Sequence, residues 1–215
     1  MKRKAWSASH ARVQQMADKR ERILDAARDR FLAEGFSAAS MDRIAEEAGA
    51  SKMTLYRHFK SKEALFLAAI NRDCAQIYAV EEHDPAITRE AAAQSLSDFG
   101  QTFVMAITEP GVLGLFRMLM GEMARFPELG RLFYDAAPAR SIAVIERILS
   151  GLLPAAEADM RARAFMHLLM GDTYQRLALG KIDFAQSATD FPAQISLAVE
   201  LILSGIGKVT PEERP

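Results

Sequence analysis

The sequence predicts an all-α protein with a small helical head followed by a larger helical body. Apolar residues recur at spacings of three and four through most of the chain, as on the buried face of a helix. There is no sustained alternation of apolar and polar residues and no Asn-Gly or Asp-Gly turn, so strand signals are missing. Prolines and glycines fall between the periodic stretches, where helices begin and end.

The composition bounds the class of protein. In 215 residues, 50% are apolar, which is enough for a buried core. Cys74 is the single cysteine, which excludes a disulfide framework within the chain and fits a reducing cytoplasm. The basic start is not followed by the apolar run of a signal peptide. The most apolar late stretch, 195–207, contains Glu200 and is shorter than the roughly 20 residues of a membrane span. We therefore expect a cytoplasmic protein without a membrane partner.

Charge is divided unevenly along the chain. Residues 1–62 hold 14 Lys/Arg and 8 Asp/Glu, a net charge of +6, whereas residues 63–215 hold 13 and 20, a net charge of −7. A basic head on an acidic body favours a protein that presents one end to a polyanion. The alternative is chance unevenness in the charge of a solvated surface.

The first predicted helix spans residues 17–34. Ile23, Ala27 and Phe31 lie on one face of it, and Gly35 occupies the position where a left-handed cap residue ends a helix. Residues 1–16 form a basic arm. Its cations could reach a DNA groove or flanking phosphates, and the alternative is a disordered, solubilising tail.

Residues 40–59 predict two short helices around a tight turn at Gly49. Ser40 and Ser51 are good N-cap residues for the first and second of these helices. Small residues near the turn let two helices approach closely, as a helix-turn-helix requires. The apolar positions that pack the pair are Met41, Ile44, Ala45, Ala48, Leu55 and Phe59.

The other face of the second helix is polar and basic. Lysine and arginine pair with phosphates or guanine edges, threonine contacts phosphates or thymine methyl groups, and tyrosine and histidine bond to the DNA backbone. Capped helix N-termini present free N–H groups to phosphate oxygens. The residues predicted from this pattern to contact double-stranded DNA are Ser40, Ser51, Lys52, Thr54, Tyr56, Arg57, His58 and Lys62.

The segment SMDRIAEEAGASKMTLYRHFKSKEALF closely resembles the TetR family of transcriptional regulators, within a match from about Arg20 to Phe66. The resemblance implies a three-helix DNA-binding head over 17–77, a ligand-binding and dimerisation domain over 78–208, and a tail over 209–215. It also implies that the Ser51–Phe59 helix lies in the major groove and that Lys62 holds a phosphate. Met53 departs from the glycine common in the family. It could read a thymine methyl group or alter the docking angle, so the operator sequence cannot be borrowed from relatives.

The body is predicted as a series of helices. A helix over 62–80 precedes the break at 83–85, and Thr88 caps a helix that continues to Ile107. Pro110, Pro127 and Pro138 each suit a helix start. The last two helices are predicted over 155–179, after Pro154, and 192–204, beginning at Pro192. Both are apolar on more than one face, which favours a homodimer formed through them.

Large, adaptable side chains in the body favour a pocket for a hydrophobic or amphipathic effector, although ordinary core packing is the alternative for each of them. The predicted pocket residues are Phe99, Phe103, Phe116, Met120, Met123, Met166, Met170 and Tyr174. The stretch EMARFPELGRLFY resembles the AefR-like C-terminal branch of the family. His167 is a candidate ligand contact, with a core histidine as the alternative, and Cys74 is either a sensor or a packed thiol.

These observations predict a homodimeric regulator, a repressor that a small effector releases from a near-palindromic operator. No nucleophile motif, metal-ligand spacing or phosphate-binding glycine loop is present, so we expect no enzyme activity, cofactor or metal. An enzyme acting on a small molecule and an architectural DNA-binding protein with little sequence preference are the two alternatives.

Overall fold

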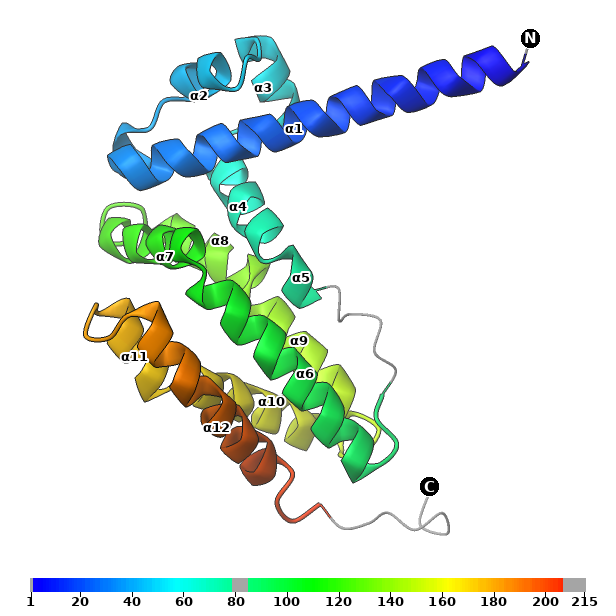
Figure 1. Ribbon diagram of the computed structural model, residues 1–215, viewed down its shortest axis with the longest axis vertical. Helices are drawn as coiled ribbons and strands as arrows, with labels where there is room; N and C mark the ends of the chain where they lie inside the picture. The colour runs from blue at the N-terminus through cyan, green and yellow to red at the C-terminus, as the bar shows by residue number, and fades with distance from the viewer. Residues whose placement is uncertain (1, 79–84, 207–215) are drawn as a thin grey trace. The chain divides into compact units, whose positions relative to one another are not determined.

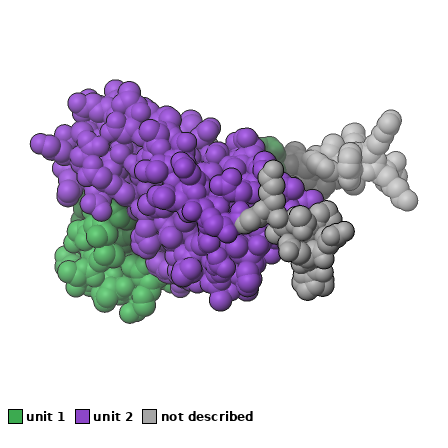
Figure 2. Space-filling model, turned by 90° about the horizontal axis from the view of Figure 1, so that it is seen from below, with its two compact units in different colours: residues 1–72, 114–132 green, residues 73–113, 133–215 purple. Residues whose placement is uncertain are grey.

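The computed structural model describes residues 2–78 and 85–206, with side chains described from residue 14 onward except at 76 and 78. These residues form helices and connecting turns with no strand among them, which confirms the predicted all-α class (Figure 1). The chain divides into two compact units, residues 1–72 with 114–132 and residues 73–113 with 133–215 (Figure 2). We call them the head and the body.

The head contains four helices from the N-terminal part of the chain. They are α1 (Lys2–Ala38), α2 (Met41–Glu47), α3 (Lys52–His58) and α4 (Lys62–Asp73), of which α4 reaches the unit boundary at Arg72. Helix α2 packs on both α1 and α3 (Figure 1). The head is completed by residues 114–132, which hold most of α7 (Pro110–Glu122) and the first part of α8 (Pro127–Ala136).

Helix α1 is longer than predicted. The backbone is helical from Lys2, through most of the stretch expected to be an arm, while the side chains of the arm's cations lie outside the described residues. The added turns carry good helix formers but no apolar stripe, so periodicity could not detect them. Gly35 has a φ of +78° and interrupts the helix where a stop was predicted, and a short turn continues to Ala38.

Four phenylalanine rings form the centre of the head. Phe36 stacks on Phe31 at a centroid distance of 5.8 Å and meets the edges of Phe66 at 5.7 Å and Phe126 at 5.3 Å. Phe31, Phe36 and Phe66 are fully buried. Phe126 comes from the separate segment 114–132, and Glu122 of the same segment accepts a hydrogen bond from the Ser37 N–H at 3.1 Å. A distant part of the sequence therefore completes the core of the head.

The body contains α5 (Ala75–Tyr78), α6 (Arg89–Thr108), α9 (Pro138–Leu149), α10 (Ala155–Leu169), α11 (Asp172–Ala178) and α12 (Phe184–Ile202). Helices α6, α9, α10 and α12 pack around a shared apolar core, in which α10 lies against both α9 and α12 and α12 lies against α6 (Figure 1). Thr88 caps α6 by accepting the Ala91 N–H at 3.1 Å, as predicted. Prolines begin α7, α8 and α9, also as predicted.

Two predicted helices of the body were wrong in extent. The helix expected over 155–179 is broken between Leu169 and Asp172 by a turn at Gly171, which gives α10 and α11. The last helix begins at Phe184, eight residues before Pro192, which lies inside it. A capping box explains the earlier start, because Asp183 accepts the Gln186 N–H and the Gln186 side chain accepts the Asp183 N–H.

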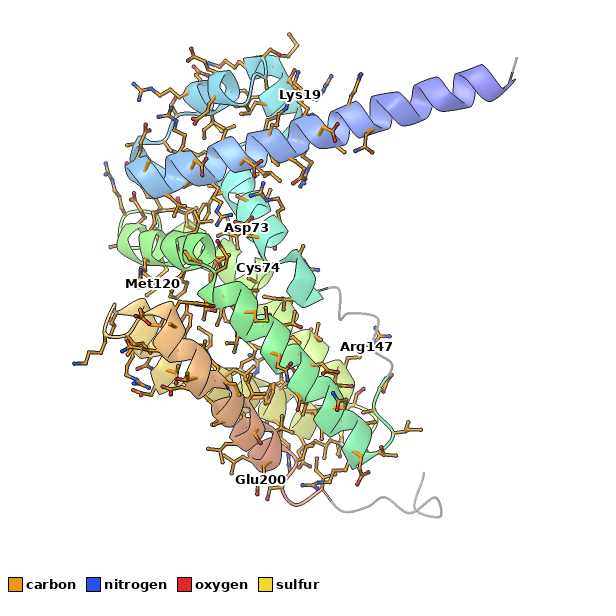
Figure 3. The ribbon with its side chains drawn as sticks, viewed as in Figure 1. Lys19, Asp73, Cys74, Met120, Arg147 and Glu200 are labelled. Atoms are coloured by element: carbon orange, nitrogen blue, oxygen red, sulfur yellow. The ribbon has the colours of Figure 1, made fainter. Side chains whose placement is uncertain are left out.

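Helix α4 ends at Asp73, so the helix predicted over 62–80 is also shorter than expected; a turn at Cys74 separates it from α5 (Figure 3). The unit boundary after Arg72 lies before the predicted boundary at 77/78, and residues 79–84 lie outside the described part of the chain. Within the described residues, no single helix is long and apolar enough to cross a membrane, and only the bent pair α6 and α7 reaches that length and composition together.

Candidate nucleic-acid interface

Helices α2 and α3 form the predicted helix-turn-helix. Gly49 adopts a φ of +59° in the turn between them, a conformation that glycine accepts without strain. Ser51 begins α3 as predicted, because its hydroxyl accepts the Thr54 N–H at 3.2 Å. Ser40 is the N-cap residue of α2 as predicted, with an extended backbone, but its side chain makes no capping hydrogen bond. The carboxylate of Asp42 in the first turn favours the same helix end.

The outward face of α3 is polar, with one apolar exception. Leu55 is fully buried and Phe59 nearly so, as the helical spacing predicted. Lys52, Tyr56 and Arg57 are exposed on the other side. Met53 is 81% exposed, so its side chain is accessible to a partner on this face.

Lys52 is not free in the absence of DNA. Its ammonium donates to Asp42 on α2 at 2.8 Å, and both side chains are more than half exposed. This hydrogen bond and the attraction of the carboxylate raise the pKa of Lys52. Asp42 therefore holds the lysine across the two helices and competes with any phosphate that approaches it. Helical spacing does not link residues ten apart, so this pairing was not predictable from the sequence.

Lys62 has a structural role in addition to its predicted one. Its ammonium donates to the carbonyls of Ser37 and Ala39, both at 3.0 Å, and lies 4.7 Å from the centre of the Phe36 ring. It thus satisfies backbone acceptors at the end of α1 and stabilises the turn between α1 and α2. The family resemblance implied only that Lys62 holds a phosphate of the DNA.

A shallow hollow of about 430 Å³ brings several predicted contacts together. It is lined by the ends of α2, α3 and α4, where the Ser61 hydroxyl accepts the Ala64 N–H at the start of α4. Three lysines, one tyrosine and a helix N-terminus line the hollow, a chemistry that suits a phosphate oxygen, although the carboxylates of Asp42 and Glu63 line it as well. The predicted DNA contacts among its lining residues are Ser40, Lys52, Tyr56 and Lys62, and Lys60 adds the third ammonium.

Other predicted contacts lie elsewhere. The Thr54 hydroxyl lies 2.8 Å from the Ser51 hydroxyl in a shared hydrogen bond. His58 is half-buried, and its Nε2 is buried without a hydrogen-bond partner in the described part of the chain. Burial lowers the pKa of His58, and the positive charges of Arg57, Arg20 and Lys19 lower it further. Lys19 lies on α1 (Figure 3). His58 is therefore neutral at pH 7 and faces the interior more than its place in the pattern suggested.

The comparisons with known proteins agree with this geometry. Residues 23–69 match the family described as bacterial regulatory proteins, tetR family. Residues 94–205, more than half of the chain, match the AefR-like transcriptional repressor C-terminal domain. The chain belongs to the TetR family. Both resemblances that the sequence suggested are confirmed.

Relatives of this TetR-family chain match over different lengths. The transcriptional activator FasR of Mycolicibacterium smegmatis is 47% identical over 55 residues, which is 26% of this chain and only 25% of FasR. The transcriptional repressor KstR of Mycobacterium tuberculosis is 25% identical over 86% of this chain and 81% of its own. The solved structure of the flavonoid-responsive regulator FrrA is 31% identical, covers 86% of this chain and 95% of that chain, and superposes with a TM-score of 0.64. The family and these relatives are regulators rather than enzymes.

The eight predicted pocket residues of this TetR-family chain are divided between the two units. Phe116, Met120 and Met123 belong to the head segment 114–132, and Met120 on α7 is exposed (Figure 3). The other five belong to the body, where the Phe99 and Phe103 rings stack at 5.7 Å, Met166 and Tyr174 are buried, and Met170 is half-buried. A hollow of about 530 Å³ lies in the body between α6 and α12, and none of the eight lines it. Pro192, which was interpreted as a helix start, lies inside α12 and is one of the residues that line this hollow.

Two further candidates are placed by the structure. Cys74 is buried, and burial raises the pKa of its thiol to about 12, which confirms the packed thiol. His167 is exposed at the end of α10, so its interpretation as a core histidine was wrong. Across the described residues, no group of three His, Cys, Asp or Glu side chains could hold a metal ion.

Proposed function

We propose that this chain is a homodimeric, sequence-specific DNA-binding repressor that a small effector releases from a near-palindromic operator. The observation that carries the proposal is the exposed face of α3, which presents Lys52, Met53, Tyr56 and Arg57 beside the lysine-lined hollow. A rigid helix with this chemistry enters a major groove, where cations meet phosphates and guanine edges. The match of residues 23–69 to the tetR family supports the same role for α3.

The second subunit is proposed to pack on the last helices. Leu197 and Leu201 of α12 and Met160 of α10 are each more than half exposed. Leu197 and Leu201 are four residues apart, so they lie on one side of α12. Covering these side chains would remove apolar surface from water, which favours association. A dimer would place two α3 helices in successive major grooves about 34–36 Å apart or more, and hence predicts two half-sites.

Repression and effector response rest on the family and its named members. The C-terminal match is to a repressor domain, KstR is a named repressor, and FrrA is named flavonoid-responsive. An effector that binds the body more tightly in the conformation with misplaced heads shifts the population away from DNA.

Selection of bound fragments from random and genomic DNA tests the proposal. We expect recovery of a near-palindromic sequence that the protein prefers over random DNA by at least about 10³-fold. Affinity should fall by about 10³-fold or more between 50 and 200 mM salt if six or more phosphates are contacted. Equal binding to random competitor DNA would instead identify an architectural protein, and turnover of a small molecule by the body would identify an enzyme.

A further inference from the structure

We propose that the hollow between α6 and α12 binds an uncharged, largely apolar small molecule whose hydroxyl group donates to the backbone carbonyl of Ala188. This assignment rests on the proposed function and names the chemical class of its effector. It uses residues of α6 and α12 that belong to the body alone.

The hollow has the form of a small-molecule site. Its volume of about 530 Å³ falls within the roughly 300–1,000 Å³ of ligand pockets. Val104, Phe191, Ile195 and Val199, all buried, line it together with buried Thr108, whose hydroxyl is already bonded to the Val104 carbonyl at 2.7 Å. An apolar ligand would therefore meet a formed, apolar surface.

The mouth of the hollow carries apolar side chains that nothing in the described chain covers. Met105 is 69% exposed and Phe184 is 53% exposed, and both line the hollow. Methionine and phenylalanine at a rim adapt to a ligand and exclude water above it. Leu197 and Leu201, which we assign to the subunit contact, do not line the hollow. Different positions of α12 therefore serve the two roles.

Charge complementarity limits the ligand to uncharged molecules. None of the described residues that line the hollow ionises; its polar side chains are hydroxyls and one amide. A carboxylate or an ammonium entering it would lose water without gaining a counter-charge, which is costly. Gln101 offers an amide that both donates and accepts, and its side chain has no hydrogen-bond partner in the part of the chain that the structure describes.

Pro192 adds an acceptor to this wall. In a helix the carbonyl of residue 188 normally accepts the N–H of residue 192, but proline has no N–H. Ala188 and Pro192 both line the hollow, so the helix segment that carries this carbonyl forms part of its wall. A ligand hydroxyl can supply the missing donor, whereas an ether oxygen cannot.

Calorimetric titration of the full-length protein with three biphenyls of one shape tests the assignment. We use para-phenylphenol as a neutral donor, para-methoxybiphenyl as a neutral molecule without a donor, and biphenyl carboxylate as an anion. The phenol should bind about 3- to 10-fold more tightly than the ether, as expected for one neutral hydrogen bond. The carboxylate should bind at least about 30-fold more weakly than the phenol, because it would be buried without a partner. Equal binding of all three molecules would overturn the proposal.

Three variants assign the binding to this hollow. Pro192→Ala restores the N–H and should remove the preference for the phenol over the ether without closing the hollow. Gln101→Arg, at an exposed position of α6, should raise the affinity for the carboxylate by about tenfold or more. Ser196→Trp fills the hollow from an exposed position and should abolish binding of the phenol, while Lys181→Ala, outside the hollow, should change nothing.

Each other outcome has a definite meaning. An unchanged preference in Pro192→Ala contradicts the carbonyl contact, and unchanged binding in Ser196→Trp contradicts the location. Conversion of the dimer to a monomer by Ser196→Trp, seen by light scattering, would identify the hollow as a subunit contact instead. Operator binding is measured on the same proteins. A protein that binds the operator but none of the biphenyls would contradict only this inference. A protein that binds no operator would contradict the proposed function.

Discussion

Replacing Phe36 with leucine tests whether the segment 114–132 belongs to the head. Phe36 is fully buried, contacts the Phe31, Phe66 and Phe126 rings, and lies under the Lys62 ammonium. Leucine keeps most of the apolar burial but loses the ring geometry. Each aromatic pair contributes about 0.5–1.5 kcal/mol beyond burial, and a cation over a ring about 0.5–2 kcal/mol. Because leucine recovers part of this, we expect the free energy of unfolding to fall by about 2–4 kcal/mol.

This loss is large against the roughly 5–15 kcal/mol that stabilises a folded domain. Thermal unfolding followed by circular dichroism should show the melting temperature falling by about 4–16 °C. Phe184→Leu is the matched control, because Phe184 is an exposed ring in the body, and its effect should stay within about 0.5 kcal/mol.

A double-mutant cycle with Phe126→Leu isolates the contact between the two distant segments. The coupling energy between Phe36 and Phe126 should be about 0.5–1.5 kcal/mol. Additive effects of the two substitutions would refute the view that segment 114–132 completes the head, and a cost below about 1 kcal/mol for Phe36→Leu would refute the stabilising role of the ring cluster.

Three further predictions concern charge and protonation. Asp42→Asn should tighten operator binding and steepen its salt dependence by about one counterion, because Lys52 is released and a negative charge leaves the interface. The control is Glu46→Gln, which removes a negative charge from α2 without releasing Lys52. It should change the operator affinity less when both variants are compared in a filter-binding assay. Lowering the pH through the ordinary pKa of histidine, about 6.5, should destabilise the wild type, because the pKa of His58 is lowered in the folded protein and the unfolded chain therefore binds the proton more tightly. The melting temperature of His58→Gln should depend less on pH than that of the wild type. Equal pH dependence of the two melting temperatures would be evidence against a buried, neutral ring. Cys74 should resist alkylation in the native protein at pH 8 and react only after unfolding, as followed by mass spectrometry, whereas rapid native labelling would contradict its burial and raised pKa.

The helix-turn-helix was predictable because its signals are local. The Ser51 cap, the turn at Gly49 and the spacing of Leu55 and Phe59 each require only a few neighbouring residues. The match of residues 23–69 to the tetR family then supported the interpretation of this pattern as part of a transcriptional regulator. The outward position of Met53 was implied by the family resemblance rather than by the spacing, and Met53 is 81% exposed.

What the sequence could not provide depends on contacts between distant residues. Nothing local indicates that Phe126 packs on Phe36, that Lys62 caps the end of α1, or that Asp42 holds Lys52. The hollow of the body was missed because it forms between α6 and α12, which are far apart in the sequence. Proline was treated as a helix start at residue 192, although a capping box at Asp183 had already begun the helix.

The account depends most on the exposed face of α3 touching DNA. The direct measurement is the affinity for the selected operator of the variant with Lys52, Tyr56 and Arg57 all replaced by alanine, which leaves Leu55 and Phe59 in the core. Each lost contact is worth about 1–3 kcal/mol, so we expect at least about a 100-fold loss of affinity with an unchanged melting temperature. An operator affinity equal to that of the wild type would contradict the account.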